Sequence, residues 1–478
     1  MKNPEAGKPM KTEPSEVSAR AAARAGACCA GSRRKLLIVA LALAAAPAFA
    51  TDLLQVYRDA LGYDAQFASA KSAWEAGQEK LPQGRAGLLP VISGSANTVW
   101  NEVDYQRRVN DPVLGRKIDS QYNTNGYQLV LTQPLFRWQN YEQYGQSKLA
   151  VAQADALFSQ ARQDLILRVS QAYFEVLLAQ ANLETSQMQK TAIGEQLEAA
   201  KRNFEVGTAT IVDTHEAQSR YDIATSQELG AQNELEIKRQ ALRLITGKVF
   251  ENLARLRRDV ELLRPQPDNM TQWVESAESG SPLVAAQQAA LEIADKEISK
   301  QRAGHLPTID LVATTGRNSA TGGLTAGAVI PYGYDSHVST VGVQLNLPIF
   351  SGGAVMSRDR EAVALRDKAR ADLDNTRRSA ALNVRQAYLG VTSGLAQVKA
   401  LRQALVSSQS SLESNKLGYE VGVRINIDVL NAQQQLALTR RDLAKAVFDT
   451  LIAQLRLKSA AGLLSEDDIQ AVNALLEK

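Results

Sequence analysis

The sequence predicts a mainly α fold class with membrane β, in which long helical hairpins pack as in a coiled coil and carry a few strands. Two proline-free tracts of about 65 residues keep a helical pattern, and each would form a helix of roughly 100 Å. Short segments before these tracts alternate polar and apolar residues, as half-buried strands do. The chain is also poor in aromatic residues, at 5%. Long tracts rich in Ala, Gln, Leu, Arg and Glu fit extended helices.

A further observation is that the pattern occurs twice. Residues 204–207 read Phe-Glu-Val-Gly and are followed six residues later by Asp213; residues 419–422 read Tyr-Glu-Val-Gly and are followed by Asp428. The offset is 215 residues in both cases. Each copy lies between two helical patterns, where glycine ends one helix and aspartate suits the first turn of the next. The sequence therefore predicts two helical hairpins and a duplicated architecture.

Residues 1–50 are predicted to be a secretory signal peptide. Arg and Lys at 33–35 precede an apolar run at 36–46, and residues 48–50 have the small-x-small form of a cleavage site, so cleavage is expected after this triplet. A membrane anchor is the alternative, but the run is short for a membrane-spanning helix. The paired arginines also hint at twin-arginine export, which the rest of the chain does not favour.

Removal of this leader changes the charge of the chain. The leader holds eight basic and three acidic residues, so 46 basic and 48 acidic residues remain, for a net charge of about −2. This balance gives no support for a nucleic-acid partner. Both cysteines, Cys28 and Cys29, also lie in the leader. The mature chain is therefore predicted to have neither a disulfide nor a cysteine-based metal site.

Each half is predicted to begin with a helix that ends at a proline. The first helix is expected at 52–80 and its counterpart at 270–302. Gly-x-Leu-Pro sequences follow at 87–90 and 304–307. Proline cannot continue a helix, and its fixed φ suits the start of a strand, so strands are expected next.

The expected strands form a hairpin in each half. Residues 340–347 alternate polar and apolar side chains, and a shorter version occurs at 127–132, with polar or Gly-rich loops near 108–120 and 319–336. Alternating segments separated by polar loops are typical of an outer-membrane barrel. A soluble sheet with one face on a core is the alternative. Four strands are too few to close a barrel, so lipid-facing strands would require several chains.

The longest predicted helices cover 138–204 and 355–419, and return helices cover 212–245 and 427–460. Their apolar stripes are narrow and padded with Ala, Gln and Ser, as on helices that pack tightly while one side stays wet.

A linker containing Pro265 and Pro267 joins the two halves. The expected organisation is a first structural repeat at 51–247, the linker at 248–267 and a second repeat at 268–478.

This pattern resembles the TolC family of outer-membrane efflux and secretion channels, outside its lipoprotein subgroup, over essentially the whole mature chain. The motifs that carry the resemblance are the paired turns at 204–213 and 419–428, residues 304–311, and residues 347–350 followed by two glycines. The resemblance implies a homotrimer in which four strands per chain complete a twelve-stranded β-barrel, continued by a long α-helical barrel.

The resemblance also implies where the protein works and with what. It implies the outer membrane of a Gram-negative bacterium, with the helices extending into the periplasm. The implied partners are outer-membrane lipid, a periplasmic adaptor (membrane fusion) protein and an inner-membrane transporter of RND, ABC or MFS type.

The sequence shows no catalytic set, so neither an enzyme nor a cofactor is predicted. Its histidines, His215, His305 and His337, stand in three different contexts. Asp213 and His215 lie two residues apart on a helix and so point to different faces, which argues against a zinc site.

The hairpin turns carry the predicted gate. A carboxylate can accept hydrogen bonds from a phenol and a guanidinium, which Asp213, Tyr419 and Arg424 would supply. By resemblance these three positions, and Gln196, match the constriction network of the family. Lys416 departs from the family pattern, because an acidic residue is expected there. Each exposed contact would contribute only about 0.2–1 kcal/mol, which suits a latch that partner binding releases.

Asp428 is expected to line the narrowest point of the pore. Three copies would form an anionic ring that favours cations. Asn431 replaces a second aspartate common in the family, so one charged layer is expected. Helix capping is the alternative role for Asp428, since Asp213 shares its position.

The turn residues Val206 and Gly207, and their counterparts Val421 and Gly422, are the expected docking points for an adaptor, because small residues let helices approach closely. Helix termination is their alternative role.

The leading functional hypothesis is a passive exit duct for a tripartite efflux pump or a type I secretion system, opened at its periplasmic end when the partners engage. A periplasmic coiled-coil or adaptor protein without a pore is the main alternative. The sequence does not identify the cargo.

Overall fold

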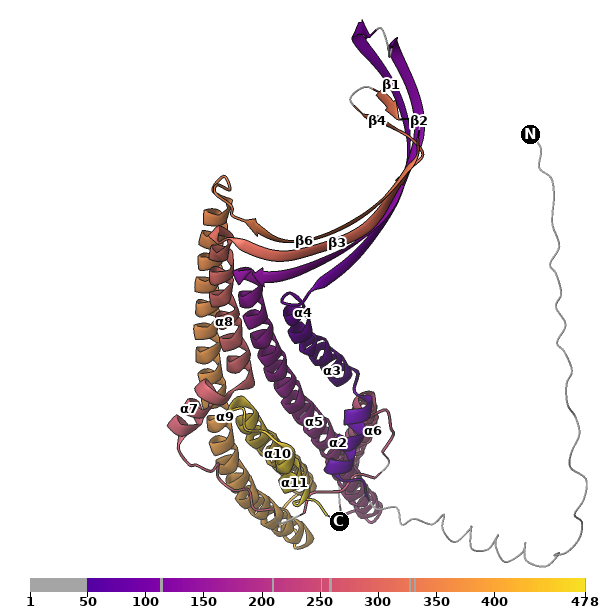
Figure 1. The fold of residues 1–478 in the computed structure, drawn as a ribbon. Coiled ribbons are helices and arrows are strands. Elements are labelled where there is room, and N and C mark those ends of the chain that lie inside the picture. The colour runs from indigo at the N-terminus through magenta and orange to yellow at the C-terminus, as the bar shows by residue number, and fades with distance from the viewer. Residues whose placement is uncertain are drawn as a thin grey trace, which may run out of the picture. The chain divides into compact units, whose positions relative to one another are not determined.

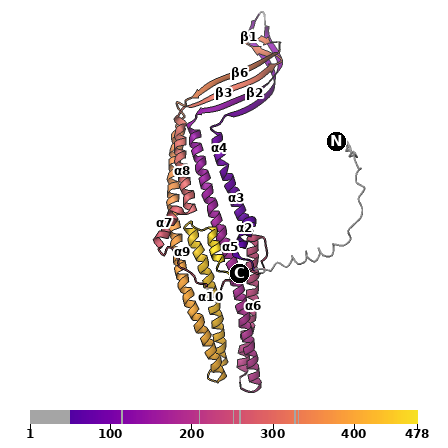
Figure 2. The same ribbon diagram turned by 60° about the horizontal axis from the view of Figure 1, so that its bottom comes forward.

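Two long helices dominate the computed structural model, which describes residues 50–111, 115–208, 210–250, 252–257, 260–325, 328–330 and 332–477. Helix α5 (Trp138–Glu205) has 68 residues and helix α9 (Ala354–Glu420) has 67. Each turns back into a shorter helix, α6 (Ile211–Thr246) or α10 (Asn426–Ala460). Figure 2 shows the turns of both hairpins at the same end of the molecule. The predicted signal peptide lies outside the described residues.

The long helices are gently curved rods (Figure 1), and their buried residues recur with coiled-coil spacing. In α9, Val384, Val391 and Val398 are buried and stand seven residues apart. This spacing keeps one apolar seam facing a neighbouring helix. Proline is absent from both rods, so the backbone hydrogen bonds continue without a break.

The expected single helix at 52–80 is wrong. The structure has three helices, α2 (Leu53–Tyr63), α3 (Ala65–Gln78) and α4 (Lys80–Ala86). Asp64 has extended backbone geometry, ends α2 and caps α3 by accepting from the amide of Phe67 at 2.6 Å. A capping carboxylate therefore makes the first break, and α4 carries Pro82 in its first turn, where a helix tolerates proline.

The counterpart at 270–302 is also divided, which corrects the second expectation. Helix α7 (Met270–Gly280) ends before Ser281, and α8 (Pro282–Arg302) begins with proline at its first position. Proline fits there because that N–H has no partner within a helix. A short 3₁₀ helix, η1 (Ala303–His305), then leads into the sheet.

Four strands form one antiparallel sheet in the order β1-β2-β3-β6, and Figure 1 shows it strongly curved. The strands are β1 (Val91–Asp111), β2 (Gly115–Phe136), β3 (Thr308–Ala320) and β6 (Tyr334–Asn346). The expectation that the first hairpin is the shorter one is wrong, because pairing continues to Gln106 and Lys117, through the segment expected to be a loop. The second connection holds a small hairpin of β4 (Gly323–Thr325) and β5 (Ala328–Ile330).

The largest core lies where the short helices meet the rods. It gathers Leu53, Tyr173, Phe174 and Phe448 with the linker residue Leu253, all buried. Helix α11 (Glu466–Asn473) belongs to this core through Ile469 and Val472, so the C-terminal segment is structured. This cluster ties both halves of the chain together.

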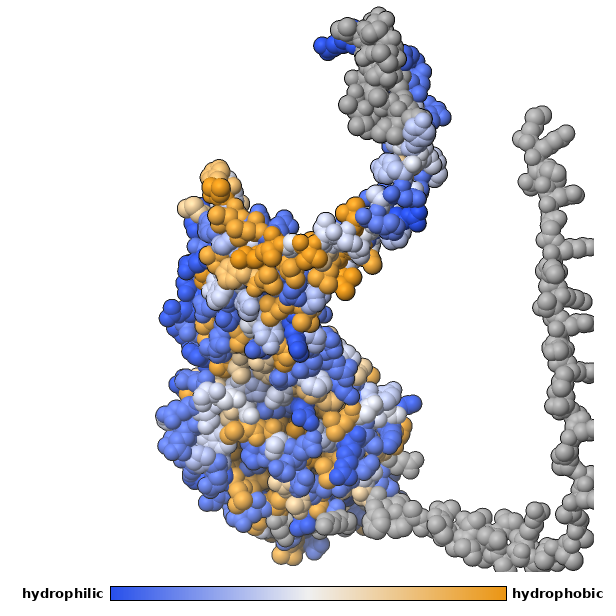
Figure 3. Space-filling model, in the orientation of Figure 1, coloured by the Kyte–Doolittle hydropathy of each residue, from blue (hydrophilic) through white to orange (hydrophobic). Residues whose placement is uncertain are grey.

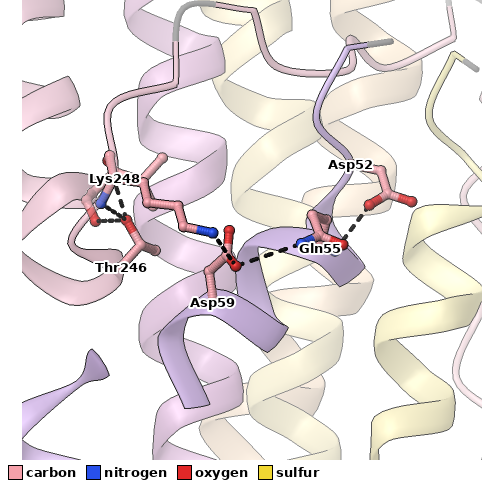
Figure 4. A network of polar contacts seen from close by, with 6 residues as sticks. Asp52, Gln55, Asp59, Thr246 and Lys248 are labelled. Atoms are coloured by element: carbon pink, nitrogen blue, oxygen red, sulfur yellow. Dashed lines mark hydrogen bonds and ion pairs between the residues drawn. The ribbon is translucent and has the colours of Figure 1, made fainter. Parts of the chain in front are cut away.

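A polar network fixes the start of α2 to the end of α6 (Figure 4). Lys248 reaches Asp59 with Nζ and Oδ1 2.7 Å apart, and Gln55 donates to the same oxygen. Asp52 caps α2 by accepting from the amide of Gln55 at 2.9 Å. Within the described ranges, no helix combines the length and apolar character that crossing a membrane requires.

Candidate functional site

The strand register places apolar side chains together on one face of the sheet. Ile92, Leu131, Ala313 and Val341 face each other across all four strands and form one row. On the same face, Leu129 lies beside this row on one side. On the other side lie the cross-strand pairs Leu311–Val343 and Ile309–Leu345. Figure 3 shows an orange band along the sheet near the helices and blue atoms farther out. The apolar face is therefore a band close to the helical end.

The opposite face of the sheet is mainly polar. Along β6, Thr340, Gly342 and Gln344 alternate with the apolar residues of the other face. Thr340 pairs with Thr314 of β3, and their hydroxyl oxygens are 2.5 Å apart. Since Val341, Val343 and Leu345 are all more than 60% exposed, neither face of this strand is covered by the chain itself.

The sheet also has two open edges. In the described residues β1 pairs only with β2, and β6 pairs only with β3. An edge strand leaves a row of backbone N–H and C=O groups without partners, and such a row is costly in an apolar medium. Pairing of each open edge with an edge strand of another copy would satisfy both rows.

A partly buried ion pair joins the sheet to the long helix. Arg137, the residue before α5, donates from Nε and Nη2 to the two carboxylate oxygens of Asp310 at 2.8 and 2.6 Å. Asp310 lies in β3 and is buried. A bidentate pair fixes orientation as well as distance, so it sets the direction in which the strands leave the helices.

The predicted docking residues lie at two nearly identical turns. Gly207 and Gly422 have φ of 78° and 79°, the left-handed geometry that favours glycine. Val206 is 72% exposed and Val421 is 65% exposed. The turns therefore present an apolar residue beside a glycine, a surface that a helical partner could contact.

The structure brings some predicted gate residues into contact with new partners. Tyr419 accepts a hydrogen bond from Asn203 at 3.1 Å, and Gln196 donates to Asn426. Both bonds join the α5–α6 hairpin to the α9–α10 hairpin. Asn203 and Asn426 were not identified from the sequence, because an asparagine near a helix end also reads as a capping residue.

Asp213 has a different environment from the one expected. Its carboxylate accepts from the backbone amide and hydroxyl of Thr210, at 2.9 and 2.7 Å, and completes a capping box at the start of α6. Among the described residues, no hydrogen bond joins it to Tyr419 or Arg424. Arg424 instead lies beside Asp428, with Nη1 and Oδ2 3.6 Å apart.

Asn431 is also paired within the chain. Arg220 of α6 donates to the side-chain oxygens of Asn431 at 3.2 Å and Gln434 at 2.9 Å. Arg220 was not predicted, since a charged residue on a long helix usually indicates a solvated face. No group of three or more His, Cys, Asp or Glu residues suited to a metal ion occurs in the described part of the chain.

Comparison with known proteins gives related sequences over most of the chain. The alkaline protease secretion protein AprF of Pseudomonas aeruginosa is 34% identical over 434 residues, which cover 89% of this chain and 88% of AprF. The outer membrane protein TolC of Escherichia coli is 32% identical over 435 residues, covering 90% of this chain and 86% of TolC.

The same architecture occurs in solved structures. The Campylobacter jejuni CmeC outer membrane channel superposes with a TM-score of 0.73 at 18% identity, covering 89% of this chain and 90% of that one. This likeness confirms the predicted fold class of long helices with a four-stranded sheet. The sequence pattern described as "Outer membrane efflux protein" matches residues 56–248 and 273–463. Together with the relatives above, this match shows that the chain belongs to the outer membrane efflux protein family.

Proposed function

We propose that three copies of this chain form a passive exit duct of a tripartite efflux pump or a type I secretion system. The duct would cross the outer membrane as a twelve-stranded β-barrel and extend into the periplasm as a helical barrel. The chain would act without catalysis. A periplasmic adaptor and an inner-membrane transporter of the RND, ABC or MFS type would be its partners.

The observation that carries this proposal is the sheet with one apolar face, one mainly polar face and two open edges. A bilayer covers an apolar face, and edges of neighbouring copies can pair. Trp100 and Tyr127 lie toward the outer end of the apolar face, as aromatic residues do at a membrane interface. A non-pore coiled-coil protein would have no use for such a sheet.

The two-repeat organisation remains part of the proposal. The first repeat would cover 51–247 and the second 268–478, with 248–267 as the linker. The matching of the family pattern once in each half supports it. The corresponding hairpins α5–α6 and α9–α10 support it as well.

We further propose that the gate lies at the hairpin turns and includes Asp213, Tyr419, Arg424 and Gln196. The bonds of Tyr419 and Gln196 across the hairpins support this role. Since Asp213 bonds within its own helix turn, its contact with Tyr419 or Arg424 would come from a neighbouring copy.

The pore ring at Asp428 is likewise proposed, with Asn431 as a neutral position beside it. Arg424 lies within 3.6 Å of Asp428 and offsets part of its charge. The adaptor is proposed to dock on Val206, Gly207, Val421 and Gly422, whose exposed turns are accessible in the single chain.

Conductance of the purified protein in planar bilayers tests the function. A duct gives small openings, whereas a non-pore protein gives none. The double variant Tyr419→Phe with Arg424→Ser, or Asp213→Ala alone, should raise conductance; an unchanged value would remove the gate assignment.

Replacement of Asp428 by Ala should weaken block by trivalent cations. Asp467→Ala is the matched control, because Asp467 also lies in the first turn of a helix, α11, far along the chain from the turns. Equal block in wild type and Asp428→Ala would place the cation site elsewhere.

A further inference from the structure

One face of α10 makes three successive contacts with the α5–α6 hairpin. Asn426, Leu430 and Gln434 stand four residues apart, so their side chains lie on the same face of the helix. Asn426 accepts from Gln196 of α5, and Gln434 accepts from Arg220 of α6 at 2.9 Å. The apolar residue of the three lies between the two polar contacts.

Leu430 enters the core of the other hairpin. It is 2% exposed and packs in a cluster with Ile193, Leu197 and Ala200 of α5 and with the α6 residues Ala217 and Ala224. Every other member of this cluster belongs to the α5–α6 hairpin, so Leu430 is its one buried contribution from α10 among the described residues. Separation of the two hairpins would expose Leu430 and the surface that receives it.

Beyond this contact the helices separate around a groove. The groove has a volume of about 300 Å³ and is lined by side chains of α5, α6 and α10, among them Asn182, Gln227 and Arg441. Its lining is about equally polar and apolar and encloses open space, so it holds the helices together less firmly than the close packing around Leu430 does. The resistance to separation near the turns therefore concentrates at the contact of Leu430 and its polar neighbours.

Further along, α10 packs against α5 again in the large core. Phe448 packs against Phe174 there, with ring centroids 5.6 Å apart. Eighteen residues of helix separate Phe448 from Leu430, a distance of about 27 Å. A rotation of roughly 10° at Phe448 would therefore move Leu430 by about 5 Å, enough to end its dispersion contacts.

We propose that Leu430 is an apolar key that holds the gate shut, with Gln196–Asn426 and Arg220–Gln434 as the polar bonds on either side of it. This inference deepens the proposed function and rests on it. Opening would swing the α9–α10 hairpin about the Phe448 contact and withdraw Leu430 from its cluster. Polar bonds alone would form a weaker closure, because bonds to water can replace much of what a protein hydrogen bond contributes.

The first test compares two leucines of α10 in planar bilayers, using the full chain. Leu430→Ala should raise the open fraction at least roughly tenfold, since truncation of a buried leucine shifts such an equilibrium by more than this factor. Leu457→Ala is the matched control, because Leu457 is 1% exposed but lies in a separate cluster with Trp273 and Val384, away from both Leu430 and Phe448. It should lower thermal stability and leave the open fraction unchanged.

The outcomes separate the inference from the function. If the wild type conducts and Leu430→Ala does not change the open fraction, the role of Leu430 is overturned and the duct stays in place. An equal rise in Leu457→Ala would overturn it as well. Absence of conductance in wild type and in every variant would instead refute the duct.

A cross-link gives a second test that does not depend on a destabilising variant. With Gln196→Cys and Asn426→Cys, oxidation should hold the channel shut and a reductant should restore opening. Lys190→Cys with Glu228→Cys is the matched control, because this ion pair, at 2.9 Å, lies within the α5–α6 hairpin. Normal opening of the oxidised Gln196–Asn426 variant would overturn the inference.

Discussion

Loss of the guanidinium at Arg168 should release helix α3 from the body of the protein. Arg168 of α5 donates to both oxygens of Asp64 at 2.9 and 3.0 Å, and Asp64 at the same time caps α3. The aspartate is 5% exposed and the arginine is 32% exposed. In Arg168→Met the packing of the aliphatic part of the side chain is kept, but the buried carboxylate of Asp64 loses its cationic partner.

The cost follows from those contacts. A hydrogen bond to a charged group contributes about 1.5–3 kcal/mol, and loss of one partner of a buried pair costs about 3–5 kcal/mol. Because Arg168 is one-third exposed, we expect about 3 kcal/mol, near the lower end. If α3 opens locally, this corresponds to roughly a 100-fold increase in amide exchange over residues 65–78.

Hydrogen exchange read by mass spectrometry measures this directly. The control is Arg264→Met, which removes an exposed ion pair with Asp268 at 3.2 Å and should leave α3 unchanged. Exchange of α3 in Arg168→Met within twofold of wild type would show that the pair does not hold the helix, and the reasoning from burial would fail.

The same pair makes the protection of α3 depend on pH. Burial by itself would raise the pKa of Asp64, but the hydrogen bonds from Arg168 and from the Phe67 amide together outweigh it and lower the pKa. A lowered pKa gives stability that is present above the ordinary value of about 3.9 and is lost as the pH falls through the folded-state value. Protection of α3, corrected for intrinsic exchange, should decline there in wild type and depend less steeply on pH in Arg168→Met.

Three further predictions concern a turn, the sheet and a buried phenol. Gly247→Ala should destabilise the protein by about 1–3 kcal/mol, because φ is 72° and the new Cβ would lie 2.6 Å from Tyr63, whereas Gly62→Ala, with open space around it, should not lower the melting temperature. Leu129→Arg on the apolar face should cost about 2–4 kcal/mol in bilayer insertion, and Gln128→Arg on the other face should insert normally in a vesicle-folding assay. Burial, with the charge and hydrogen bond of Glu466, raises the pKa of Tyr57 to about 12. The stability that Tyr57 contributes should thus persist to about pH 10 and be lost as the pH approaches 12. In an ultraviolet titration, the wild type and Tyr57→Phe should therefore show the same tyrosine ionisation near pH 10.

The long helices could be predicted because residues close to their ends in the sequence determine where they begin and end. The return helix expected at 212–245 is Ile211–Thr246, and the one expected at 427–460 is Asn426–Ala460. A glycine with positive φ stands at the turn before each of them, and no proline interrupts the backbone hydrogen bonds within the helices. Such signals do not depend on distant partners.

The breaks in the shorter helices show where local reasoning failed. Ser281 followed by Pro282 is a common helix start, yet the helical pattern that continues across 270–302 predicts a single helix. Asp64 had no comparable signal, because its role depends on Arg168, which lies 104 residues later. Polar residues near 108–120 resemble a loop, yet β1 and β2 continue into this segment and satisfy their backbone bonds by pairing with each other.

The positions of the proposed gate residues along the hairpins could be predicted from the sequence, but their contacts could not. Sequence comparison of the two turns located Asp213, Tyr419 and Asp428 near the ends of hairpins. It could not pair Gln196 with Asn426 or Arg220 with Gln434, because residues more than 200 apart become neighbours only through the packing of two hairpins. Leu430 was hidden for the same reason, since an apolar stripe does not reveal which neighbouring helix it faces.

The open edges of the sheet have a consequence for how a closed ring would reach its size. If β6 of one copy pairs with β1 of the next, each added chain turns the growing wall through an angle fixed by the curvature of its own four strands. The number of members is then decided by geometry inside every chain, without any separate counting contact. A chain in which one edge strand cannot pair would prevent closure of any ring that it joins. A small proportion of such chains would therefore leave many assemblies incomplete.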